Sequence, residues 1–171
     1  MNYAGAGFVL FSSDLSHLLL VHDAKSGKWG FPKGHRELSD ANDLHTAVRE
    51  MWEETGLVQA EYTIHDEAFK IGKGGSSSYL FRYAILNFGV SPDKVRAESE
   101  QEIASLEWVP LSTLLTAQNV LDGNKYLRTW ISDLQSPIPK KHTRLLRTLL
   151  GSTRFHPTQE AMSANNIVTC S

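Results

Sequence analysis

The sequence predicts an α+β domain in which a mixed β-sheet is sandwiched between helices. Short apolar runs bounded by turn residues predict strands near residues 6–11, 18–21, 62–69, 79–88 and 103–109. Apolar residues at helical spacing predict one helix ending before Gly56 and another starting at about Asn124. The resulting order, strand–strand–helix–strands–helix, favours a mixed sheet packed against helices.

The first predicted helix has recognisable ends. Asn42 or Asp43 can cap its N-terminus, and Gly56 occupies a typical C-terminal glycine position. Its apolar positions have helical spacing and comprise Leu44, Ala47, Val48, Met51 and Trp52. We expect Val48, Met51 and Trp52 to be buried against the sheet. Before this helix, two glycines flank a proline in residues 29–34, which predicts a constrained irregular segment.

The second half of the chain ends in a segment of different character. Residues 72–78 predict a flexible loop, and residues 111–115 begin a short helix after Pro110. Beyond residue 139, leucines alternate with arginines and predict a short basic amphipathic helix. Residues 152–171 are polar and aperiodic, so we expect disorder there. The predicted organisation is one domain over residues 1–135 and a basic extension over residues 136–171.

Composition restricts the class of protein. Residues 1–135 carry a net charge of −6 and residues 136–171 a net charge of +4. An acidic body is a poor general nucleic-acid binder but suits a site that holds cations. The basic extension is either a solvated tail or a contact for an anionic partner. No membrane span or signal peptide is expected, and the single cysteine, Cys170, favours a reducing, cytoplasmic location.

Three carboxylates crowd one face of the first helix. At about 100° per residue, Glu53 and Glu54 lie on either side of Glu50, one turn further on. Like charges at this spacing destabilise a helix unless a cation neutralises them. Ligands that are all oxygen favour magnesium, manganese or calcium over zinc. On its own, this pattern is also compatible with a solvated acidic face.

Residues 34–57 resemble the Nudix box. The second half of that motif, Arg-Glu, an apolar residue, any residue, Glu-Glu, any residue, Gly and an apolar residue, is matched from Arg49 to Leu57. The first half departs from the motif, because Asp40 stands where a glutamate is expected and the loop to Arg49 is one residue longer. Asp40 or Glu37 could fill the position of the first glutamate. The resemblance implies the Nudix fold over about residues 3–135.

The resemblance also implies roles for individual residues. Glu50, Glu53 and Glu54 would hold Mg²⁺, for which Mn²⁺ could substitute, and the Gly34 carbonyl would complete the site. Arg49 would orient a glutamate of the box. The segment around Glu102 resembles part of mRNA decapping enzymes, which makes Glu102 a candidate general base or additional metal ligand, with Glu98 and Glu100 as competitors. The implied activity is hydrolysis of a phosphoric anhydride, a nucleotide pyrophosphatase reaction.

Two features bear on the substrate. Residues 29–35 resemble a segment of diadenosine tetraphosphate hydrolases, and decapping enzymes share its Trp-Gly-Phe-Pro-Lys-Gly part, residues 29–34. Lys33 and His35 could contact phosphates. Tyr79 and Tyr83 are candidates for stacking on a base, and we expect Phe81 on the opposite face of their strand. Decapping would require a basic channel or a separate RNA-binding region, and the body of the chain is acidic, so a dinucleoside polyphosphate is the first expected substrate. Capped RNA and diphosphoinositol polyphosphates are alternatives, and a non-catalytic module binding nucleotides or a protein is an alternative of another class.

Overall fold

The computed structural model describes residues 3–72, 78–116 and 122–151. They form eight strands and four α-helices, together with short 3₁₀ helices at Gln59–Glu61 and Pro92–Lys94. The strands are β1 (Gly5–Phe11), β2 (His17–Asp23), β3 (Trp29–Gly30), β4 (Lys33–His35), β5 (Tyr62–Ile64), β6 (Phe69–Ile71), β7 (Tyr79–Leu86) and β8 (Ile103–Pro110). The helices are α1 (Asp43–Thr55), α2 (Leu111–Thr116), α3 (Lys125–Gln135) and α4 (Lys141–Gly151).

All eight strands belong to one mixed sheet. The central order is β3-β2-β1-β7-β5, while β4 pairs with β1, β6 with β7 and β8 with β2. The β1–β7 pair is parallel and the other pairs are antiparallel. This topology confirms the mixed sheet expected from the order of elements.

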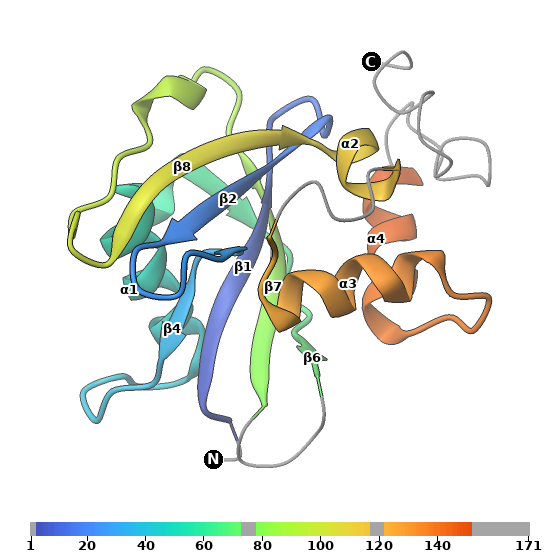
Figure 1. Cartoon of the computed structure of the whole chain (residues 1–171), viewed down its shortest axis with the longest axis horizontal. Helices are drawn as coiled ribbons and strands as arrows, with labels where there is room; N and C mark the ends of the chain where they lie inside the picture. The colour runs from blue at the N-terminus through green and yellow to red at the C-terminus, as the bar shows by residue number, and fades with distance from the viewer. Residues whose placement is uncertain (1–2, 73–77, 117–121, 152–171) are drawn as a thin grey trace.

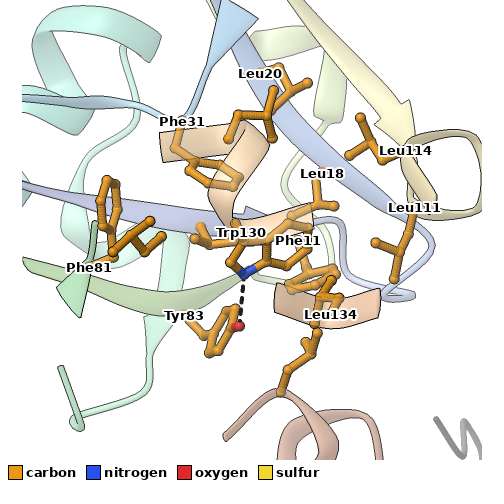
Figure 2. Close-up of a cluster of buried hydrophobic side chains, with 14 of the residues drawn as sticks. Phe11, Leu18, Leu20, Phe31, Phe81, Tyr83, Leu111, Leu114, Trp130 and Leu134 are labelled. Atoms are coloured by element: carbon orange, nitrogen blue, oxygen red, sulfur yellow. Dashed lines mark hydrogen bonds between the residues drawn. The ribbon is translucent and has the colours of Figure 1, made fainter. Parts of the chain in front are cut away.

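Helices cover both faces of the sheet (Figure 1). Alternate residues of β1 point to opposite faces. Phe8 and Leu10 pack in the cluster that contains Met51 of α1, whereas Phe11 packs with Trp130 of α3. Figure 2 shows this second cluster, with Trp130 at its centre. The α/β/α sandwich expected from the sequence is therefore confirmed.

Helix α4 packs into the same core as α3. Leu146, Leu149 and Leu150 are buried in the Trp130 cluster, while Arg144 and Arg147 are exposed. This arrangement confirms the basic amphipathic helix. The division of the chain at residue 135 stays a prediction, and the disorder expected for residues 152–171 lies outside the described residues, as does most of the loop expected at 72–78.

Several local expectations were wrong. The single strand expected at residues 62–69 is two short strands, β5 and β6, which both pair with β7. The segment expected to be irregular contains β3 and β4. Trp52 is 46% exposed, because it lies on α1 away from the residues that face the sheet. None of the helices in the described ranges is long and apolar enough to cross a membrane.

Candidate active site at the carboxylate helix

Helix α1 is fixed at both ends and on one face. The Asn42 side chain caps its N-terminus by accepting a hydrogen bond from the backbone N–H of His45 at 2.9 Å. Gly56 ends it in the left-handed conformation, with φ of 75°, and its N–H donates to the Trp52 carbonyl at 2.8 Å. Met51 is buried against the sheet. The rigid helix therefore holds Glu50, Glu53 and Glu54 at a fixed place beside β4.

The backbone of β4 lies directly against two of these carboxylates. A Cβ atom added to Gly34 would lie 2.0 Å from Cδ of Glu50, so any larger residue there would displace the Glu50 carboxylate. The backbone N–H of Lys33 donates to Oε1 of Glu54 at 3.1 Å. The close approach places the Gly34 backbone beside Glu50, where the resemblance expects a carbonyl ligand.

Arg49 joins the loop before α1 to the carboxylates. Its Nε and Nη2 donate to the two oxygens of Asp40 at 3.0 and 2.9 Å, and Nη2 also donates to the His35 carbonyl at 2.9 Å. Its Nη1 donates to Glu50 at 2.9 Å and to Glu53 at 3.3 Å. Paired bonds of this kind fix a guanidinium in one orientation. Arg49 therefore connects Asp40 to Glu50 and Glu53.

Asp40, rather than Glu37, anchors Arg49. The Asp40 side chain is fully buried, and it also accepts hydrogen bonds from Thr46 Oγ1 at 2.9 Å and from the Glu37 backbone N–H at 2.8 Å. The Glu37 side chain is 58% exposed and lies 3.5 Å from Arg49. Hydrogen bonds from Arg49 hold the pKa of the Asp40 carboxyl well below its ordinary value, despite burial.

Burial and mutual repulsion perturb the carboxylates. Burial, followed by the charge of Glu53, raises the pKa of Glu50 to about 7 against the opposing effect of Arg49. Burial also raises the pKa of Glu54 to about 8, with a contribution from Glu50 and opposition from the Lys33 N–H. A raised pKa means that the surroundings disfavour the ionised form of a carboxyl group. A divalent cation at this place would favour the ionised form.

A loop before β8 brings further carboxylates to the site. The N–H groups of Arg96 and Glu98 donate to the carbonyls of Thr55 and Glu53 at 2.8 and 2.9 Å, so the loop docks on the C-terminal end of α1. The Glu102 side chain is exposed, and its charge contributes to the raised pKa values of Glu50 and Glu54. Glu102 is thus within electrostatic reach of both.

The fit of these residues to a metal ion is chemical rather than geometric. In residues 3–72, 78–116 and 122–151, no three carboxylate, imidazole or thiol groups form a metal-binding cluster. Glu50 and Glu53 turn toward Arg49, and Glu54 turns toward Lys33. The donors are nevertheless all oxygen, which suits a hard divalent cation.

A cleft of about 440 Å³ opens beside Glu54, between β2, β3 and the start of α3. Lys33 projects there, with Nζ 5.0 Å from the ring centroid of Tyr79 and 5.3 Å from that of Tyr126. Burial lowers the pKa of the Lys33 ammonium, opposed by the charge of Glu54. His35 is exposed, with its ring 5.8 Å from that of Tyr79. The sequence analysis missed Tyr126, because this half-buried residue has the same helical spacing as the core residues of α3.

Tyr83 occupies the core, so the expected contact with substrate does not fit its position. It is 1% exposed, and its hydroxyl donates to the His142 carbonyl at 3.0 Å. The same hydroxyl accepts a hydrogen bond from Trp130 Nε1 at 3.0 Å (Figure 2). Tyr79, Phe81 and Tyr83 all belong to the Trp130 cluster. The expectation that Phe81 faces the opposite way was wrong, because residues two apart share one face of a strand.

Comparison with known proteins agrees with this geometry. The family model of the NUDIX domain matches residues 1–131. The chain belongs to the Nudix family. A Caenorhabditis elegans Ap4A hydrolase in a binary complex superposes with a TM-score of 0.56 at 22% identity, over 86% of this chain and 96% of that one. RenU, a Nudix hydrolase from M. Smegmatis, gives a TM-score of 0.58 at 18% identity, over 81% and 90% of the two chains. Both show a shared Nudix fold.

The curated relatives include enzymes that act on capped mRNA. The m7GpppN-mRNA hydrolase dcap-2 of Caenorhabditis elegans is 27% identical over 92% of this Nudix chain and 21% of the relative. The mRNA-decapping enzyme subunit 2 of Arabidopsis thaliana is 27% identical over 84% of this chain and 41% of the relative. This chain thus spans about a fifth of the nematode protein and about two fifths of the plant protein.

Proposed function

We propose that this Nudix protein hydrolyses the polyphosphate bridge between two nucleosides, with Mg²⁺ as cofactor. The observation that supports the proposal is the position of the three α1 carboxylates. Arg49 and the β4 backbone hold them by hydrogen bonds, and one of them, Glu54, lines a cleft that also contains Lys33. A metal-binding group next to a positively charged cleft suits a substrate with several phosphates.

Glu50, Glu53 and Glu54, with the Gly34 carbonyl, would hold the metal, and Mn²⁺ would substitute for Mg²⁺. When bound, the cation would offset charge on the phosphoryl oxygens and make an attacking water more acidic. Arg49 keeps Glu50 and Glu53 in place. The chain therefore contributes oxygen ligands from one helix, and the raised pKa values of Glu50 and Glu54 would fall once positive charge is present.

The reaction itself requires one proton acceptor. Water oxygen attacks phosphorus, the bridging P–O bond breaks, and the leaving phosphate keeps the bonding electron pair. Glu102 is the proposed base or additional ligand, because it lies near both Glu50 and Glu54 and is exposed to water. Lys33 and His35 would contact the phosphates. The ring of Tyr79 lies beside both of these side chains and would position them.

A capped RNA end and a free dinucleoside polyphosphate share this bridge. The free dinucleotide was the first expectation, because the body of the chain is acidic. The cleft weakens that reasoning, since Lys33, Lys125 and Arg128 gather beside Glu54. The nematode and plant decapping relatives align over 92% and 84% of this chain, beyond the 131 residues of the family match. We therefore favour the capped end, with diadenosine tetraphosphate as the second candidate on the motif at residues 29–35.

Two alternatives stay distinct. A diphosphoinositol polyphosphate carries more negative charge and no base, so it would need only the cationic side of the cleft. A non-catalytic binding module would not need all three of Glu50, Glu53 and Glu54, which are present here. Both alternatives make different predictions in one assay.

The test is incubation of the purified protein with Mg²⁺ and each of three substrates, a capped RNA, diadenosine tetraphosphate and a diphosphoinositol polyphosphate, with products separated by chromatography. Release of a cap nucleoside diphosphate from RNA supports the favoured substrate, whereas faster formation of ATP and AMP supports the second. Glu54→Gln should remove most of the rate, and Glu107→Gln, an exposed residue of β8, should not. Absence of Mg²⁺-dependent turnover on all three would refute the proposal.

A further inference from the structure

The start of α3 faces the same cleft as the α1 carboxylates. The cleft is lined by four basic side chains, Lys28, Lys33, Lys125 and Arg128, and by the acidic side chains Asp23 and Glu54. Lys28 is paired with Asp122 at 3.2 Å. In the portion of the chain that the structure describes, Lys33, Lys125 and Arg128 have no carboxylate within 4.0 Å. Within the described ranges, these three cations of the cleft therefore make no ion pair.

The ring of Tyr126 organises two of these cations. Nζ of Lys33 lies 5.3 Å from the ring centroid and Nζ of Lys125 lies 5.2 Å from it. Both distances are within the range of a cation–π contact. The ring itself is held by Tyr79, whose centroid is 4.9 Å away. Two ammonium groups with the same charge thus gather around one fixed ring, although each repels the other.

The backbone fixes this arrangement against β3. The N–H of Trp29 donates to the Asp122 carbonyl at 2.8 Å, and the N–H of Asn124 donates to the Trp29 carbonyl at 2.7 Å. A Cβ atom on Gly30 would lie 2.1 Å from Nδ2 of the Asn124 side chain, so glycine permits this close approach. The 11-residue helix α3 has no acidic residue in its first turn, and its N-terminal end carries partial positive charge.

We propose that Lys33 and Lys125, positioned by the ring of Tyr126, form a phosphate clamp that grips the polyphosphate chain of the substrate next to Glu54. An anion between the two ammonium groups would relieve their repulsion and form charge-assisted hydrogen bonds with both. Lys125 is a substrate-binding residue in this scheme, and Tyr126 is a positioning residue. The inference rests on the proposed function for the identity of the substrate, but the clamp binds phosphate chains whether or not they are cleaved.

The test is calorimetric titration of the full chain with inorganic tripolyphosphate, which has phosphates and no base. Lys125→Gln should weaken binding about tenfold, as expected for loss of one charge-assisted hydrogen bond. Tyr126→Leu should weaken it about fivefold through loss of two cation–π contacts, whereas Tyr126→Phe keeps the ring and should match the wild type. Lys70→Gln, an exposed residue of β6 outside the cleft, is the matched control for charge.

Kinetics with the cleaved substrate separate a clamp from a structural effect. Lys125→Gln should raise KM more than it lowers kcat, because its contact is made before and during the reaction. Thermal unfolding identifies any loss of fold in Tyr126→Leu, and Lys125 is exposed, so its variant should fold normally.

The two proposals fail separately. Unchanged tripolyphosphate affinity in both Lys125→Gln and Tyr126→Leu would overturn the clamp, even if the wild type hydrolyses its substrate. A loss of nucleoside binding in Tyr126→Leu with unchanged tripolyphosphate affinity would also overturn it, because the ring would then contact a base. Tripolyphosphate binding that depends on Lys125, in a protein without turnover, would support the clamp and refute the hydrolysis.

Discussion

Replacing Asp40 by asparagine tests whether the anchoring of Arg49 stabilises the protein. Asp40 accepts four hydrogen bonds, at 3.0 and 2.9 Å from Arg49, 2.9 Å from Thr46 and 2.8 Å from the Glu37 N–H. An amide has one acceptor oxygen, so its nitrogen would face donors that the carboxylate now satisfies. Breaking a buried ion pair costs about 3–5 kcal/mol. The Arg49 side chain is 16% exposed and would still pair with Glu50 and Glu53. We therefore expect Asp40→Asn to lower the free energy of unfolding by about 3 kcal/mol, at the lower end of that range.

The measurement is urea denaturation followed by tryptophan fluorescence, with Asp40→Asn compared to wild type. In a thermal scan of a chain of this size, a loss of about 3 kcal/mol corresponds to a fall in Tm of about 6–12 °C. Turnover should fall about 10–100-fold, because Arg49 no longer has a fixed orientation.

The pH dependence of stability gives a second readout. Because the pKa of Asp40 is lower in the fold than its ordinary value of 3.8, ionised Asp40 stabilises the fold at pH values above 3.8. This stabilisation is lost as the pH falls through the folded pKa. The variant should therefore show a weaker loss of stability below about pH 4.

Glu37→Gln is the matched control for this prediction, because Glu37 lies in the same loop with its side chain 58% exposed. It should change the free energy of unfolding by less than about 0.5 kcal/mol. If Asp40→Asn also stays within about 0.5 kcal/mol of wild type, or Glu37→Gln costs more, the assignment of Asp40 as the anchor is refuted.

Three further predictions test other parts of the structure. Gly34→Ala should reduce turnover about 100-fold in steady-state kinetics, because its Cβ would displace Glu50; wild-type turnover would contradict the close approach. Tyr83→Phe should cost about 1–3 kcal/mol in urea denaturation, because the Trp130 N–H and the His142 carbonyl lose their partner; a neutral effect would contradict the buried network. Metal-free protein should lose stability as pH rises from about 5 to 8, because the pKa values of Glu50 and Glu54 are raised to about 7 and 8 in the fold. Mg²⁺ should oppose this loss in thermal scans, and a metal-free stability that is flat over this range would contradict the raised pKa values.

The sequence predicted the parts of the fold that depend on local pattern. The cap at Asn42, the glycine stop at Gly56 and the amphipathic leucines of α4 each follow from the residue type and its position. The two short strands β5 and β6 were not separated, because a single apolar stretch carries no sign that both halves pair with β7.

The site was predictable where it lies on one helix and less so elsewhere. The spacing of Glu50, Glu53 and Glu54 places them on one face without any tertiary information. The choice between Asp40 and Glu37 depended on burial, and the position of Tyr126 beside Lys33 depended on the pairing of Trp29 with the start of α3. Contacts between residues about ninety positions apart leave no periodic signal in a single sequence.

The most direct test of the central proposal is a titration of metal-free protein with Mn²⁺, detected by electron paramagnetic resonance. Wild type should bind Mn²⁺ in competition with Mg²⁺, and Glu53→Gln and Glu54→Gln should each weaken binding at least about tenfold while circular dichroism shows an intact fold. Glu107→Gln should bind as wild type does. Equal Mn²⁺ affinity in wild type, Glu53→Gln and Glu54→Gln would contradict the assignment of the α1 carboxylates as the metal site.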